Sequence, residues 1–145
     1  MPAKIVFARP AGAFVLLGLV LAVGCSSSRS VETLTVTAHE QKLTPDNYDA
    51  IVKSAKPALI DFSAAWCGPC QAVKPDVEAL AREMDGELVV AIADMTERGK
   101  AAAAPVAAAW NIEAYPTFVL VREGQELARH EGAPGDLKGW VRSNL

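Results

Sequence analysis

The sequence predicts an α/β domain whose largely parallel sheet is completed by an antiparallel hairpin. Short apolar runs suited to buried strands alternate with segments whose apolar residues recur at helical spacing. Such alternation requires a mostly parallel sheet, because helices supply the crossover connections. Near the C-terminus two strand-like runs follow each other across Glu123-Gly124-Gln125, which is a hairpin signal.

The first half of the predicted domain opens with an edge strand over Val31–Thr37, where apolar residues alternate with threonines. A helix follows, because Thr44 suits its N-cap and Pro45 its first position. Lys56-Pro57 ends this element, since the residue before a proline disfavours helical geometry. The apolar run Ala58–Ser63 then predicts a buried central strand.

The second half continues the alternation. A helix is predicted from Cys67 to about Met84, and a second buried strand over Glu87–Ala93. The alanine-rich stretch 101–109 favours another helix, whose regular part begins at Pro105. Two strands and a short final helix complete the predicted order, over the ranges Thr117–Arg122, Glu126–Glu131 and Gly135–Asn144.

Length and composition limit the possible classes of protein. The chain has 145 residues, of which 51% are hydrophobic and 21% charged, as expected for one folded domain rather than a disordered or fibrous protein. The formal net charge of −3 argues against a nucleic-acid binder, which normally presents a basic face.

The N-terminal segment has the three parts of a secretory signal. Lys4 and Arg9 form a basic start, Ala11–Val23 an apolar run, and small residues precede Cys25. As a helix, the 13 residues of the run would rise about 20 Å, less than the roughly 30 Å hydrocarbon core of a bilayer. We therefore expect a signal peptide over residues 1–24 rather than a membrane span.

The residues before Cys25 also resemble the lipobox of bacterial lipoproteins, as Leu21-Ala22-Val23-Gly24-Cys25. The usual leucine three places before the cysteine is Ala22 here. The resemblance implies that Cys25 is lipidated and that 25–30 tether residues 31–145, the predicted domain, to a membrane facing the periplasm or extracytoplasmic space. An ordinary signal peptide ending beside a cysteine is the alternative.

The sequence Trp66-Cys67-Gly68-Pro69-Cys70 lies between a predicted strand and a predicted helix. Together with Asp61-Phe62, Pro75 and Tyr115-Pro116-Thr117, it resembles the thioredoxin family from about Val31 to Leu145. The resemblance implies a thioredoxin-like three-layer α/β/α sandwich with a central mixed β-sheet.

A helix N-terminus suits the chemistry of these cysteines. Its unpaired N–H groups and positive dipole end favour a thiolate, and the two-residue spacing lets both sulfurs meet at the first turn. The resemblance implies that Cys67 is the exposed nucleophile and Cys70 the shielded, resolving thiol. An inert disulfide and a half zinc site are alternatives, but zinc needs four ligands, and His39 and His130 are not at ligand spacing.

Asp61 lies inside an apolar run, where desolvation would raise its pKa into a range useful for proton transfer. The resemblance implies that it deprotonates Cys70. The family often pairs this carboxyl with a lysine on the next strand, but Val89–Ala93 contains none, so the pKa of Asp61 is expected to be strongly perturbed.

The resemblance also identifies Tyr115-Pro116 as a cis-proline loop beside the dithiol, where a substrate chain pairs in extended form. The residues expected to complete an apolar, substrate-binding rim around Cys67 are Trp66, Gly68, Pro69 and Gly132. Trp110 and Trp140 are expected to be core or helix-packing residues.

These features predict a thiol-disulfide oxidoreductase, a monomer that reduces protein disulfides outside the cytoplasm. It would need no metal and no cofactor beyond the Cys67–Cys70 disulfide, and a membrane or periplasmic thiol donor would recharge it. Disulfide oxidation or isomerisation and cytochrome c maturation are enzyme alternatives. A membrane-anchored binding or assembly module with an incidental dithiol is the non-enzyme alternative.

Overall fold

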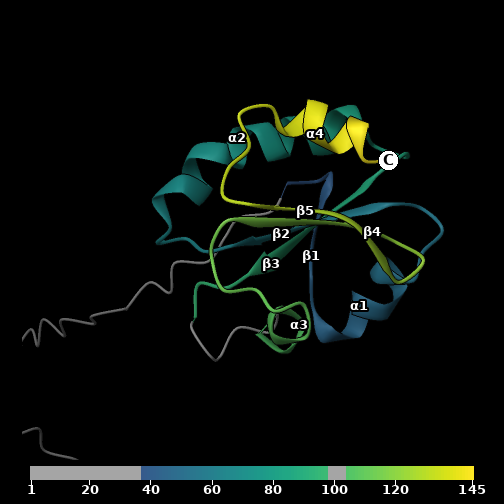
Figure 1. Cartoon of the computed structure of the whole chain (residues 1–145), viewed down its shortest axis with the longest axis horizontal. Coiled ribbons are helices and arrows are strands. Elements are labelled where there is room, and N and C mark those ends of the chain that lie inside the picture. The colour runs from purple at the N-terminus through teal and green to yellow at the C-terminus, as the bar shows by residue number, and fades with distance from the viewer. Residues whose placement is uncertain (1–36, 98–103) are drawn as a thin grey trace, which may run out of the picture. The chain divides into compact units, whose positions relative to one another are not determined.

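The computed structural model describes residues 37–97 and 104–145. They form a five-stranded sheet with helices on both faces (Figure 1). The strands are β1 (Glu40–Lys42), β2 (Ala58–Ser63), β3 (Val89–Asp94), β4 (Thr117–Arg122) and β5 (Gln125–Glu131). The helices are α1 (Pro45–Val52), α2 (Gly68–Glu83), α3 (Ala104–Ala109) and α4 (Leu137–Ser143).

The sheet is mixed, as predicted. Its strand order is β1-β3-β2-β4-β5, so that β2 lies at the centre. Strand β3 pairs in parallel with both β1 and β2, whereas β4 is antiparallel to β2 and to β5. All six residues of β2 are buried, because neighbouring strands and helices cover both its edges and both its faces.

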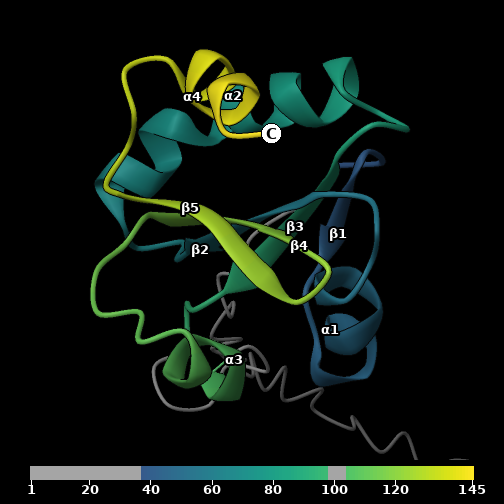
Figure 2. The same cartoon turned by 45° about the vertical axis from the view of Figure 1, so that its right-hand side comes forward.

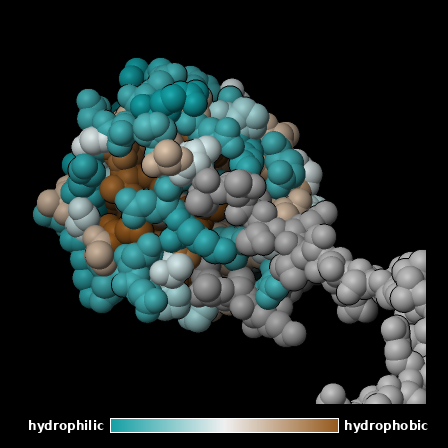
Figure 3. Space-filling view, turned by 180° about the vertical axis from the view of Figure 1, so that it is seen from behind, coloured by the Kyte–Doolittle hydropathy of each residue, from teal (hydrophilic) through white to brown (hydrophobic). Residues whose placement is uncertain are grey.

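Helices α2 and α4 cover one face of the sheet, and α1 and α3 cover the other (Figure 2). Val77 of α2 and Val141 of α4 belong to the apolar core on the first face, and Ile51 of α1 and Val106 of α3 to the core on the second. The predicted three-layer sandwich is therefore confirmed. Seen from behind, mostly hydrophilic side chains surround recessed hydrophobic ones (Figure 3).

Local sequence signals set several boundaries correctly. Strands β2 and β4 have the predicted ranges, and α1 begins at Pro45 after the N-cap Thr44. The Thr44 N–H donates to Asn47 Oδ1 at 2.8 Å, which satisfies a backbone group at the start of this helix. Helix α1 ends earlier than predicted, at Val52.

The first strand differs from the prediction. Residues 31–36 of the predicted strand Val31–Thr37 lie outside the described residues, and Thr37 is not in a strand. The first described strand is β1, in which Glu40 pairs with Val90 of β3. Its sequence, Glu-Gln-Lys, carries no apolar alternation, so its pairing depends on the tertiary fold rather than on a local pattern.

The turn of the final hairpin is also shorter than predicted. Only Glu123 and Gly124 separate β4 from β5, and both have positive φ, 52° and 80°. Their N–H groups donate to Ser54 O and Val52 O, at 2.9 and 2.8 Å. Contacts with the end of α1 therefore hold a left-handed glutamate that local propensity disfavours.

Candidate active site

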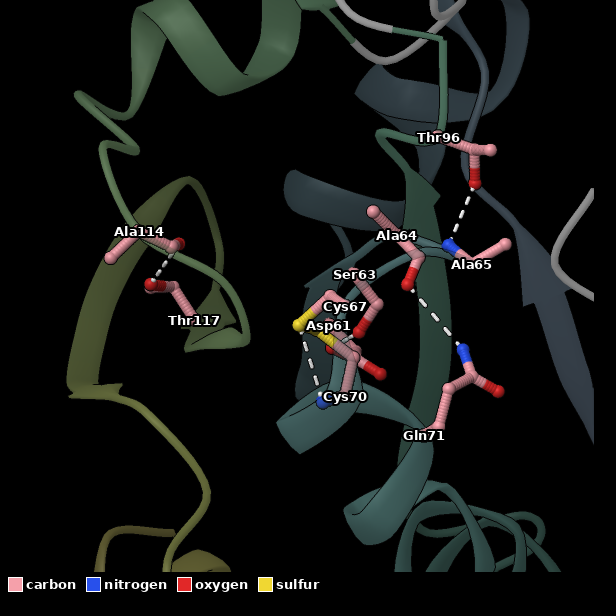
Figure 4. Close-up of a disulfide and its surroundings, with 10 residues drawn as sticks. All are labelled: Asp61, Ser63, Ala64, Ala65, Cys67, Cys70, Gln71, Thr96, Ala114 and Thr117. Carbon is pink, nitrogen blue, oxygen red and sulfur yellow. Dashed lines mark hydrogen bonds between the residues drawn. A yellow bond between two sulfur atoms is a disulfide. The ribbon is translucent and has the colours of Figure 1, made fainter.

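The end of β2 and the start of α2 place the two cysteines. Cys67 is the N-cap of α2, and its N–H donates to Ala64 O at 3.1 Å. Cys67 and Cys70 form a disulfide with Cα atoms 5.2 Å apart, and Cys67 Sγ accepts the Cys70 N–H at 3.3 Å (Figure 4). The same helix-terminal N–H would stabilise a Cys67 thiolate after reduction.

As residues, the two cysteines are almost equally buried, which differs from the expectation of an exposed Cys67. Cys67 is 6% exposed and Cys70 is 3% exposed. They differ instead in the cavity that each contacts: Cys67 lines an open groove, and Cys70 lines a much smaller cavity.

The groove beside Cys67 has a volume of about 660 Å³. Its lining includes Trp66, Gly68 and Pro69, three of the residues expected in the rim, and Tyr115 of the proline loop. Trp66 is 45% exposed, and its Nε1–H donates to Thr96 O at 2.9 Å. Its ring meets that of Tyr115 edge-on, with centroids 6.0 Å apart. An exposed, anchored aromatic beside a sulfur suits the binding of another molecule.

The Tyr115–Pro116 peptide bond is cis, as the resemblance implied. Pro116 itself is buried, and its carbonyl accepts the Gly132 N–H at 2.7 Å. Neither Pro116 nor Gly132 is among the residues that line the groove. Gly132, predicted for the rim, therefore lies outside the groove lining and contacts the proline loop through this hydrogen bond.

Sequence reasoning missed three residues of the groove. Glu113 and Ala114 line it directly before Tyr115, so their adjacency to the proline loop was an available signal. Met95 follows the carboxyl end of β3, beside the carboxyl end of β2 from which the dithiol emerges. The rule that sites form outside the carboxyl ends of parallel strands points to it.

Asp61 lies behind the disulfide, on the central strand (Figure 4). Burial raises the pKa of its carboxyl to about 7; a hydrogen bond from Ser63 opposes this shift, and the charge of Glu40 adds to it. The direction agrees with the prediction of a perturbed carboxyl. At neutral pH such a group both accepts and releases a proton readily.

Asp61 and Cys70 share a cavity of about 10 Å³, with room for roughly one water molecule. Its other lining residues are Glu40, Ser63, Lys74, Val77 and Ile92. Ile92 lies opposite Asp61 in the β2–β3 register. The ionisable neighbours of Asp61 come instead from β1 and α2, as Glu40 and Lys74, and the sequence prediction contained neither.

The remaining candidates lie away from these cavities or outside the described residues. Trp110 donates from Nε1 to Tyr48 Oη at 3.0 Å and packs against the core, and Trp140 packs beside α2, both as predicted. Cys25 and the predicted leader lie outside the described residues. Within residues 37–97 and 104–145, no helix is long and apolar enough to cross a membrane, and no three His, Cys, Asp or Glu residues cluster to hold a metal.

Comparison with known proteins identifies the family that the sequence resembles over most of its length. The sequence profile of the Thioredoxin family matches residues 39–143. Thioredoxin H2-1 of Oryza sativa subsp. japonica is 36% identical over 105 residues, which cover 72% of each chain. Thioredoxin of Mycolicibacterium smegmatis is 33% identical over 106 residues, which cover 73% of this chain and 88% of the relative. Protein disulfide isomerase-like 1-3 of Arabidopsis thaliana is 36% identical over 90 residues, but these cover only 15% of its length.

Proposed function

The chain belongs to the thioredoxin family and is a thiol-disulfide oxidoreductase, and from this premise we propose that it reduces protein disulfides outside the cytoplasm from a lipid anchor. The observation that identifies the attacking thiol is the difference between the cavities beside Cys67 and Cys70. Cys67 borders a groove of about 660 Å³, whereas Cys70 borders a cavity of about 10 Å³, the size of roughly one water molecule. The substrate disulfide is therefore attacked by Cys67.

The reaction begins from the reduced dithiol. The Cys67 thiolate attacks one sulfur of the substrate disulfide, a mixed disulfide forms, and the other substrate sulfur leaves as a thiolate that takes a proton from water. Asp61 then accepts the Cys70 proton, and the Cys70 thiolate attacks Cys67 Sγ. The second substrate thiolate leaves, so two electrons have passed to the substrate and the Cys67–Cys70 disulfide remains.

The groove favours an extended substrate backbone. Trp66 and Tyr115, which belongs to the cis-proline loop, provide apolar contact, and main-chain pairing along 113–115 would bind a peptide with little demand on its sequence. This supports protein disulfides as a class. A membrane or periplasmic thiol donor returns the enzyme to the dithiol form.

Reduction is proposed over oxidation or isomerisation because Gly68-Pro69 between the cysteines resembles the reducing members of the family. The measurement that tests the direction is the reduction potential of the Cys67–Cys70 couple against glutathione. For this two-electron couple about 30 mV corresponds to about 1.4 kcal/mol, so a modest difference in potential sets the direction. A potential as oxidising as that of dedicated disulfide donors would overturn the proposal.

Insulin reduction tests the activity itself. The Cys67→Ser variant should lose activity, because serine cannot attack a disulfide, whereas Ser26→Ala, which changes the proposed tether, should keep it. Equal activity in Cys67→Ser and the unaltered chain would overturn the proposed mechanism.

The proposed lipid anchor rests on the position of Cys25 after Leu21-Ala22-Val23-Gly24. In bacterial cells the unaltered chain should fractionate with membranes and incorporate labelled palmitate. Cys25→Ala should release the protein from the membrane and abolish labelling, and Ser27→Ala serves as the matched control. Membrane association without Cys25 would contradict lipidation.

A further inference from the structure

The cavity behind the disulfide contains a second carboxyl group that the proposed mechanism does not use. Glu40 lines this cavity together with Asp61 and Cys70, and it is only 7% exposed. Its Oε2 accepts the Thr37 N–H at 2.7 Å. A carboxyl group that is buried and held by the backbone in this way has a defined position relative to Asp61.

The strand register explains how Glu40 reaches this cavity. Glu40 pairs with Val90 on β3, two residues before Ile92, and Ile92 pairs with Asp61 on β2. Residues paired across strands, and residues two apart along one strand, point to the same face of a sheet. Glu40 and Asp61 therefore both point toward α2, from two strands that do not pair with each other.

The other groups on this face divide into hydrogen-bonded, paired and apolar ones. Ser63 donates to Asp61 Oδ1. Lys74 of α2 lines the cavity, and its Nζ lies 3.6 Å from Glu78. Lys42, beyond Glu40 on β1, lies 3.6 Å from Asp94. Strands β3 and β4 present the apolar Ile92 and Phe118 opposite Asp61.

Glu40 is thus an acidic group in the cavity of Asp61, and each of the nearby lysines has its own acidic partner. Glu40 and Asp61 line one small cavity, so a negative charge on Glu40 makes a proton on Asp61 more favourable. This agrees with the raised pKa of Asp61, to which Glu40 contributes after burial.

We propose that Glu40 is a positioning residue for proton transfer, which makes Asp61 a stronger base toward Cys70 by its charge across the shared cavity. This inference rests on the proposed role of Asp61. In this step the Cys70 proton moves to a carboxylate oxygen of Asp61, directly or through one cavity water, and leaves for solvent after the Cys67–Cys70 disulfide has formed.

The placement of Glu40 separates proton transfer from substrate binding. Glu40 is on the α2 face behind Cys70, whereas the substrate groove is lined by residues beside Cys67 and the cis-proline loop. The two cavities share no lining residue, so we expect substrate in the groove to leave the side chains around Asp61 in place. We expect the effect of Glu40 to be the same for large and small disulfide substrates.

The test is a titration of Asp61 by infrared spectroscopy in the oxidised protein. The Asp61 carboxyl band is assigned as the band that Asp61→Asn removes. In Glu40→Gln, which retains an oxygen to accept the Thr37 N–H, the band should titrate at lower pH than in the unaltered chain. Glu87→Gln, which removes an equal charge from an exposed site beyond α2, should leave the titration unchanged.

A second readout follows the resolving step in single-turnover experiments. Its pH profile should move to lower pH in Glu40→Gln by the same interval as the infrared titration, and its plateau should be several-fold lower because Asp61 has become a weaker base. In the Asp61→Asn background, Glu40→Gln should cause no further change in the profile. Glu40→Ile, which suits a strand and also lacks the charge, should shift the Asp61 band in the same direction.

Three results would overturn the inference: an unchanged Asp61 titration in both Glu40 variants, an equal shift in Glu87→Gln, or a Glu40 effect that persists without Asp61. A failure of the underlying role of Asp61 is distinguishable. In that case Asp61→Asn would resolve the mixed disulfide with the same pH profile as the unaltered chain, whatever residue occupies position 40.

Discussion

The cavities on the two sides of the Cys67–Cys70 disulfide differ far more than the exposures of the two cysteines. The cysteines are 6% and 3% exposed, yet Cys67 lines a groove of about 660 Å³ and Cys70 a cavity of about 10 Å³. The groove has aromatic walls, and the cavity contains two carboxyl groups. The roles of the two thiols therefore depend on what surrounds each sulfur, with one side suited to a substrate chain and the other to a proton.

The largest expected effects come from replacing either cysteine with serine. Cys67→Ser should reduce the rate of insulin reduction by at least about 10³-fold, because the nucleophile is lost. Cys70→Ser should also stop turnover, but it should still attack and then accumulate a mixed disulfide. Non-reducing electrophoresis measures this adduct. If Cys67→Ser accumulated the mixed disulfide instead, Cys70 would be the attacking thiol and Cys67 the resolving one.

The next effect concerns the cavity side. Asp61→Asn should slow resolution of the mixed disulfide by about 10²-fold near neutral pH, because a positioned base has been removed. The rate difference should narrow at higher pH, where Cys70 ionises without assistance. Stopped-flow kinetics across roughly pH 5–10 checks this expectation. A constant ratio of rates at every pH would mean that Asp61 has a structural role alone.

Asp61 should also make stability depend on pH. Its pKa is raised from 3.8 to about 7 in the folded chain, so the folded state holds the proton more tightly than the unfolded state. This contribution is fully present below about pH 4 and is lost as the pH rises through about 7. The free energy of unfolding should then have fallen by up to about 4 kcal/mol. Urea unfolding of the oxidised protein measures the fall, which Asp61→Asn should remove.

A smaller effect on catalysis is expected from a substitution in the groove beside Cys67. Trp66→Ala removes the ring that meets Tyr115, and it should lower kcat/KM for a protein disulfide by about 3- to 10-fold. The change should lie mainly in KM, with the resolving step unaltered. A small aromatic disulfide provides the control, because it needs less of the groove. An altered pH profile for resolution in Trp66→Ala would mean that the two sides are not independent.

The smallest functional effect is expected far from both cavities. Gly124 has φ of 80° in the β4–β5 turn, and no atom beyond its two chain neighbours lies within 4 Å of the place that a Cβ would take, so Gly124→Ala meets mainly backbone strain. The free energy of unfolding should fall by about 1 kcal/mol, with unchanged insulin reduction. Chemical denaturation measures the loss. A change in activity would show that the hairpin turn influences the dithiol.

Strong local patterns predicted the interior of the fold well. The apolar runs of β2 and β4 and the N-cap of α1 have their expected places, because burial and capping act over a few neighbouring residues. The strand β1 was missed, since three polar residues acquire strand geometry only through pairing with β3. The hairpin turn was also misjudged, because contacts with the end of α1 hold Glu123 in a left-handed conformation.

The residues of the candidate site likewise divide into those that the sequence predicted and those that it missed. Cys67, Cys70, Asp61 and the rim residue Trp66 were predictable because motif and neighbours carry the signal. Met95 and Glu40 were missed, because Met95 follows β3 and Glu40 is on β1, both far in sequence from the dithiol motif. Gly132 was assigned to the rim, but its N–H is bonded to the carbonyl of Pro116 behind it.

The sequence by itself determined the fold class, the position of the dithiol at a helix N-terminus and the presence of a desolvated carboxyl before it. These properties follow from the order of apolar runs and from one compact motif. Only the tertiary structure decided which cavity each sulfur contacts and which groups surround Asp61. The physical reason is that the register of β1, β3 and β2 brings Glu40 and Asp61 to one face, and no local pattern encodes that register.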